Sequence, residues 1–174
     1  MTGPSNEQDS FQEFREIVGF LRSLWAVLAG VSVFFPLSNV LAQVVPLATW
    51  PDKGGLVFLS PLLVSTLSTV GCLFAILWTL VQRGQYARQK KQSVRRLAGL
   101  SLASGALALV LYLAANFAIV GDIHGAFGVD SSHPIRILGD IVLLFTYTCF
   151  FAFTTRAFML LGLLEYFRKG RQPV

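Results

Sequence analysis

The sequence predicts an all-α polytopic membrane protein, a four-helix transmembrane bundle with an N-terminal amphipathic cytoplasmic helix. Apolar residues make up 54% of the 174-residue chain, and charged residues only 13%. Soluble domains are typically about 25% charged. The apolar residues gather in four runs, each near the roughly 20 residues that a helix needs to cross a bilayer. The runs lack the period-two alternation of strands, which excludes a membrane barrel.

The start of the chain predicts a short helix outside the membrane. Residues 1–9 are expected to be flexible, and residues 10–174 to form a single four-span domain. Ser10 and Glu13 have the spacing of a capping box, which marks a helix start. An apolar stripe follows at three- and four-residue steps, typical of an amphipathic helix: Phe11, Phe14, Val18, Leu21 and Trp25. We interpret this helix as lying on the inner membrane interface. The alternative is a docking helix for a soluble partner, contacted through Phe11 and Phe14.

The four spans are expected at about residues 18–41, 56–81, 97–120 and 141–164. Their orientation follows from the basic residues, which concentrate on the cytoplasmic side of membrane proteins. The loop between the second and third spans holds six basic residues and no acid: Arg83, Arg88, Lys90, Lys91, Arg95 and Arg96. The two other loops each hold one basic residue, Lys53 and Arg136. Both termini and the basic loop are therefore expected in the cytoplasm, in a plasma membrane or a bacterial inner membrane.

The basic loop also predicts a partner. Anionic lipids attract basic residues beside a span by roughly 1 kcal/mol each, so we expect lipid contacts at Arg88, Lys90, Lys91, Arg95 and Arg96. The net charge of +5 could suggest nucleic acid. We expect no nucleic-acid partner, because the basic residues lie where membrane orientation already requires them.

Small and polar residues recur at steps of three and four along the spans. Such seams allow helices to approach closely in lipid. In the first span they are Ser23, Ala26 and Gly30; in the second Ser65, Ser68, Cys72 and Ala75; in the third Ser101, Gly105 and Ala108; in the fourth Thr148, Ala152 and Thr155. Their period predicts left-handed packing with crossing angles near about +20°. The seams would hold one chain's helices together, line a pore or form a subunit contact, and the sequence does not separate these functions.

One charge inside the fourth apolar run is costly. Arg156 is followed directly by apolar residues, and a charge at the bilayer centre costs at least about 2.5–3.5 kcal/mol. If the span begins nearer residue 135, Asp140 becomes the immersed charge instead. One interpretation is that the Arg156 side chain snorkels to the interface. The other is that it faces an aqueous cavity or pairs with an acid such as Glu13 or Glu16.

No sequence motif of a nucleophile, phosphate-binding loop or zinc protease occurs, so we expect no enzymatic activity and no cofactor. His124 and His133, with Asp122 and Asp130, leave metal binding in an outer loop as a weak alternative. The leading hypothesis is a non-enzymatic membrane subunit that acts by oligomerisation, or by anchoring and signalling to a cytoplasmic protein partner. The alternative is an oligomeric ion channel or pore-forming effector with Arg156 near the pathway. A homo-oligomer or a larger membrane complex suits both.

Overall fold

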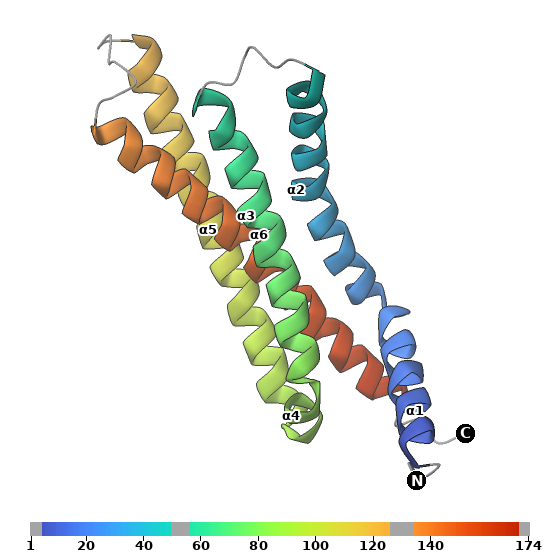
Figure 1. The fold of residues 1–174 in the computed structure, drawn as a ribbon. Helices are drawn as coiled ribbons and strands as arrows, with labels where there is room; N and C mark the ends of the chain where they lie inside the picture. Colours follow the sequence, from blue (N-terminus) through green and yellow to red (C-terminus); the bar gives the residue numbers. More distant parts are fainter. Residues whose placement is uncertain (1–4, 50–55, 126–133, 171–174) are drawn as a thin grey trace.

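The computed structural model describes residues 5–49, 56–125 and 134–170, which are helical apart from short breaks. No described residue lies in a strand, and the all-α fold class is confirmed. The helices in chain order are α1 (Ser5–Leu21), α2 (Leu24–Thr49), α3 (Leu56–Val81), α4 (Arg83–Arg88), α5 (Lys91–Gly125) and α6 (Pro134–Lys169). Figure 1 shows α1 and α4 at one end of the molecule, together with the last turns of α6.

Four of the helices are long and apolar enough to cross a membrane. The segments that satisfy both conditions are Leu24–Val44 in α2, Leu62–Val81 in α3, Lys91–Phe117 in α5 and Ile141–Lys169 in α6. The helices α5 and α6 extend beyond the expected third and fourth spans at both ends. The number of spanning helices that the sequence predicts is therefore confirmed, and it fits a multi-pass membrane protein.

The first span begins at Leu24 rather than near Val18, which corrects the expected boundary. The helix breaks at Arg22 and Ser23, because the Ser23 hydroxyl oxygen accepts a hydrogen bond from the Ala26 backbone N–H at 3.3 Å. This serine cap starts a new helix. The apolar residues just before the break belong to α1, which itself begins at Ser5, ahead of the predicted start.

The central element is α6, which packs against α5, α3 and α2, while α2 also packs against α3. Figure 1 shows α6 crossing α3 and α5 obliquely. Every residue from 146 to 167 is buried or half-buried, so other parts of the molecule cover this stretch of α6, at least in part, on all sides. The other spans each keep a wide apolar face exposed, as Val70 on α3 and Leu107 on α5 illustrate. Such faces suit lipid contact, so α6 is the core around which the other spans pack.

Small residues let α6 approach its neighbours. A Cβ atom at Gly105 of α5 would lie 2.9 Å from the Thr154 hydroxyl oxygen, and one at Gly162 of α6 would lie 2.9 Å from the Ser23 hydroxyl oxygen. At Gly71 of α3 the corresponding distance to a Thr148 methyl carbon is 3.3 Å. Each of the three neighbours of α6 therefore meets it at a glycine.

Several buried hydroxyl groups in the spans have hydrogen-bond partners. The Ser68 hydroxyl donates to the Val64 carbonyl oxygen at 2.7 Å, and the Thr79 hydroxyl donates to that of Ala75 at 2.7 Å. Across helices, the Thr155 hydroxyl donates to the Cys72 sulfur at 3.4 Å. Because an unpaired polar group is costly in an apolar medium, these bonds allow a polar seam to be buried.

We expect Gly105→Val to destabilise the bundle, because the added methyl groups enter a contact that is already at its limit. Overpacking of this kind costs about 1–3 kcal/mol. Gly99→Val is the matched control on the same helix, since nothing lies within 4 Å of its Cβ position. Reversible unfolding of both variants in detergent measures the difference. Equal loss of stability in the two variants would show that helix propensity, and not the α5–α6 contact, decides the effect.

Candidate functional site at the basic end

One end of the molecule carries most of the positive charge. We call it the basic end and define it by α1, α4, the first turns of α5 and the last turns of α6 (Figure 1). Its cations are Arg83, which is half-buried, and a set of exposed residues: Arg15, Arg22, Arg88, Lys90, Lys91, Arg95, Arg96, Arg168 and Lys169. The five residues predicted to contact lipid in the basic loop are thus all solvent-accessible here.

Helix α1 is docked on the end of α6 through aromatic packing. Phe20 is only 3% exposed, and its ring meets Tyr166 edge-on with centroids 6.5 Å apart. A Cβ atom at Gly19 would lie 3.0 Å from the Tyr166 ring, so α1 approaches α6 closely at this point. Neither Phe20 nor Tyr166 was singled out by the sequence pattern, although Ile17 and Phe20 have the three-residue spacing of a second apolar face.

An ion pair joins α1 to α4. The Arg83 Nη2 donates to the Glu13 Oε1 at 2.6 Å. The Arg83 side chain is 27% exposed and that of Glu13 is 64% exposed, and such surface pairs contribute about 0.2–1 kcal/mol. This contact corrects the hypothesis that Glu13 pairs with Arg156, because the Glu13 carboxylate is paired with Arg83 at the basic end.

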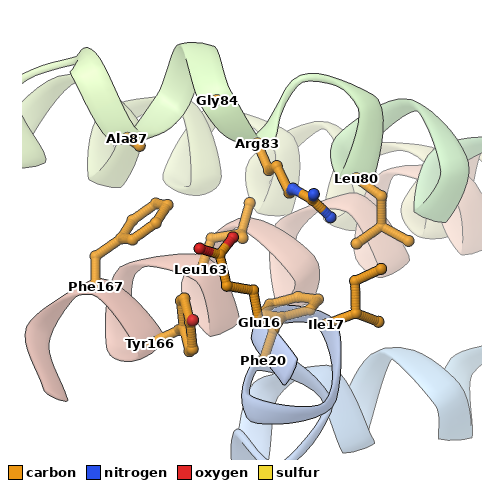
Figure 2. Close-up of a pocket in the computed structure, with 10 residues that line it drawn as sticks. All are labelled: Glu16, Ile17, Phe20, Leu80, Arg83, Gly84, Ala87, Leu163, Tyr166 and Phe167. Carbon is orange, nitrogen blue, oxygen red and sulfur yellow. The ribbon is translucent and has the colours of Figure 1, made fainter. Parts of the chain in front are cut away.

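A cavity of about 100 Å³ lies between α1, α4 and the end of α6 (Figure 2). Glu16 and Arg83 extend into it from opposite sides, and its walls include the rings of Phe20, Tyr166 and Phe167. A smaller cavity of about 50 Å³, lined by Lys91 of α5 among others, lies against Phe167 as well. The larger cavity combines charged groups with aromatic surface, and its volume limits a ligand to a small group.

The N-terminal part of the apolar stripe, Phe11 and Phe14, does not face the bundle. Phe11 is 74% exposed and Phe14 is 66% exposed, and Leu21 is exposed as well. At the far end of the stripe, Trp25 stacks on Phe158 of α6 with ring centroids 5.9 Å apart. The docked face of α1 is therefore the Ile17 and Phe20 side, and the two N-terminal phenylalanines have no covering element among the described residues.

Arg156 lies apart from this cavity, within α6. Its side chain is half-buried, and its Nε atom is buried without a hydrogen-bond partner in the part of the chain that the structure describes. It follows Thr155 on α6, which is buried against Cys72 of α3. Asp140, the alternative immersed charge, lies in α6, but its side chain is outside the described residues.

The predicted seams are placed as follows. Those of α3 and α5 are buried: Ser65, Ser68, Cys72, Ala75, Ser101, Gly105 and Ala108. On α6, Thr155 is buried, and Thr148 and Ala152 are half-buried. In α2 the expected Gly30 is exposed and Ala29 is buried in its place, because the helix starts at the Ser23 cap and its buried face follows from there. Both cross-helix hydroxyl contacts of the α3 seam, at Ser68 and Cys72, go to α6.

Asp122 and His124, two of the residues that could bind a metal, lie at the end of α5 rather than in a loop, and their side chains are outside the described residues. Asp130 and His133 lie outside the described residues altogether. Within the described residues no group of three or more His, Cys, Asp or Glu side chains is placed to hold a metal ion.

No protein-family model, no curated protein and no solved structure matches the chain. Its function is therefore argued from the geometry of the basic end and the spans.

We expect Glu13→Gln and Arg83→Gln each to loosen α1, because each removes one half of the ion pair. A double-mutant cycle on amide exchange in α1 should give a coupling of about 0.2–1 kcal/mol that decreases with added salt. Arg15→Gln, at an exposed position on the same helix, is the control. A coupling of zero between positions 13 and 83 would contradict a role of the pair in docking α1.

Proposed function

We propose that the protein is a non-enzymatic integral membrane subunit that anchors a soluble cytoplasmic partner at its basic end. The observation that carries the proposal is the pair of exposed phenylalanines, Phe11 and Phe14, on a helix that is itself docked by Phe20. Exposed apolar side chains that gather on one face commonly mark a protein interface. The folded part of α1 would present this face to a partner.

The position of α1 favours a protein partner over lipid for this face. Glu13, which lies between the two phenylalanines, contacts Arg83, and Arg83 lies two residues beyond Val81, the end of the α3 span. The phenylalanines are thus level with or beyond the basic residues that border the membrane. Figure 1 shows α1 continuing roughly in the direction of α2. A helix that projects in this way differs from one lying flat on the interface.

The exposed cations of the basic end support the same orientation and add a second contact. A surplus of Lys and Arg beside spanning helices favours the cytoplasmic side, in a plasma membrane or a bacterial inner membrane. Arg88 at the end of α4, Lys90 in the following turn and Lys91 at the start of α5 would attract anionic lipid headgroups or acidic groups of the partner. Oligomerisation would use the apolar outer faces of the spans, where Leu107 and Val110 of α5 are exposed.

We expect a photo-crosslinking amino acid at position 14 to capture a soluble protein in intact cells. The matched control is the same amino acid at position 34, because Phe34 is also an exposed phenylalanine, 63% accessible, but lies within the α2 span. Phe14→Asp should abolish co-purification of the captured protein while membrane insertion is unchanged. Crosslinks from position 14 to lipid alone would contradict the proposal and favour an interfacial α1.

A second candidate function is an oligomeric channel, and it is favoured by the buried Nε atom of Arg156, which has no hydrogen-bond partner among the described residues. A guanidinium nitrogen without a hydrogen-bond partner is costly between spans, and water or an anion in a pathway would supply the missing partner. The pathway would need several chains, because the seams of one chain are used in its own packing.

Ion flux through liposomes that hold the purified protein tests this candidate. We expect a channel to conduct anions in the wild type and to lose anion selectivity in Arg156→Leu, because the positive charge has gone. Arg22→Leu, at an exposed position before α2, is the matched control. An absence of flux from well-folded wild type would count against a constitutive channel. An Arg156→Leu variant as stable as wild type, or more stable, would then fit the Nε atom of Arg156 that is buried without a hydrogen-bond partner.

A further inference from the structure

One carboxylate that lines the larger cavity at the basic end, that of Glu16, has no ion-pair partner among the described residues. Arg83 forms its ion pair with Glu13, and the second ion pair of the described residues joins Lys169 to Glu165. Glu16 forms no ion pair in this part of the chain, and Figure 2 shows its carboxylate extending into the cavity. Glu13 and Glu16 together carry two negative charges against the single positive charge of Arg83, so this group of three side chains has a net negative charge. A cationic ligand suits it.

The walls of the cavity specify the kind of cation. Phe20 and Tyr166 meet edge-on, and the rings of Tyr166 and Phe167 are tilted with centroids 5.7 Å apart. Aromatic faces attract an organic ammonium group and bind it by cation–π contact. A metal ion would need several oxygen ligands, whereas the acidic lining residue here is Glu16. The combination of one carboxylate and three rings favours an alkylammonium group.

The level of the cavity relative to the spans indicates the source of the alkylammonium group. Leu80, one of the lining residues, lies at the end of the α3 span, and Arg83 lies just beyond it. The cavity is therefore at the level where lipid headgroups meet the apolar layer. Its volume of about 100 Å³ suits a headgroup amine rather than an acyl chain. An arginine also has five N–H donors, and the contact with Glu13 leaves others for a neighbouring phosphate.

We propose that this cavity binds the alkylammonium group of an ethanolamine phospholipid, with Glu16 accepting the ammonium hydrogen bonds, Phe20, Tyr166 and Phe167 surrounding it, and Arg83 meeting the phosphate. The site is independent of the soluble partner proposed above, because it uses the opposite face of α1 from Phe11 and Phe14. Its ligand is zwitterionic, which separates it from the anionic lipids expected at the exposed cations.

Native mass spectrometry of the full chain in detergent tests the site, with dioleoyl phosphatidylethanolamine as the probe and dioleoyl phosphatidylglycerol as the comparison lipid. Because phosphatidylglycerol can bind the exposed cations of the basic end instead, we expect its retention to be the same in wild type and Glu16→Gln, unlike that of the ethanolamine lipid. Glu16→Gln should bind the ethanolamine lipid about tenfold more weakly, as expected for one lost charge-assisted contact. Glu165→Gln is the matched control, because Glu165 is also an α-helical glutamate at the basic end but does not line the cavity.

Phe167→Leu keeps an apolar side chain and removes one ring, so it should weaken retention by roughly two- to fivefold, the size of a cation–π contact. Thermal unfolding of each variant identifies one that has failed to fold. Free ethanolamine separates the two sources of the amine. Competition by millimolar ethanolamine would support the alkylammonium site with a soluble amine as its ligand, and no competition would support the lipid. Equal retention of the ethanolamine lipid by wild type and a folded Glu16→Gln, or an equal loss of phosphatidylglycerol in that variant, would overturn the proposal.

Discussion

The fold depends on the close packing of α6 against three other helices. In lipid, apolar side chains gain little free energy by leaving their surroundings, so helices associate mainly through van der Waals contact between small residues. Gly71, Gly105 and Gly162 provide these contacts at three faces of α6. Because α6 contacts each of the other spans, the places of α2, α3 and α5 all follow from it. The docking of α1 depends on α6 as well, since Tyr166 holds Phe20.

The spanning helices could be predicted from the sequence because hydropathy acts over whole segments. The expected second span, 56–81, has the bounds of α3. The buried face of α3 also follows from the sequence, since its small and polar residues repeat with the period of a helix. The first span was less predictable, because apolar residues continue across the break at Arg22 and Ser23. The boundary lies at a single serine cap, which packs against Gly162 of α6.

Most of the candidate site could not be predicted from the sequence. The Glu13–Arg83 pair joins residues 70 positions apart, and no local pattern marks such a pair. The cavity likewise needs α1, α4 and α6 to meet. The stripe through Phe11 and Phe14 could be recognised by its periodicity, but a periodic apolar face does not identify the partner that will cover it. On the docked face of α1, Glu13 and Glu16 lie about one helical turn before Ile17 and Phe20. The apolar pattern of this face is therefore weaker in the sequence.

The break at Ser23 also has a mechanical consequence. As a single helix of 36 residues, α6 is about 54 Å long at 1.5 Å per residue. A tilt of about 10° around its midpoint would displace its last turn by about 5 Å, by the same geometry. Tyr166 would transmit that displacement to α1, while the interruption at Ser23 lets α1 swing without bending α2. A change in the tilt of α6 among the spans would therefore reach the surface that α1 presents.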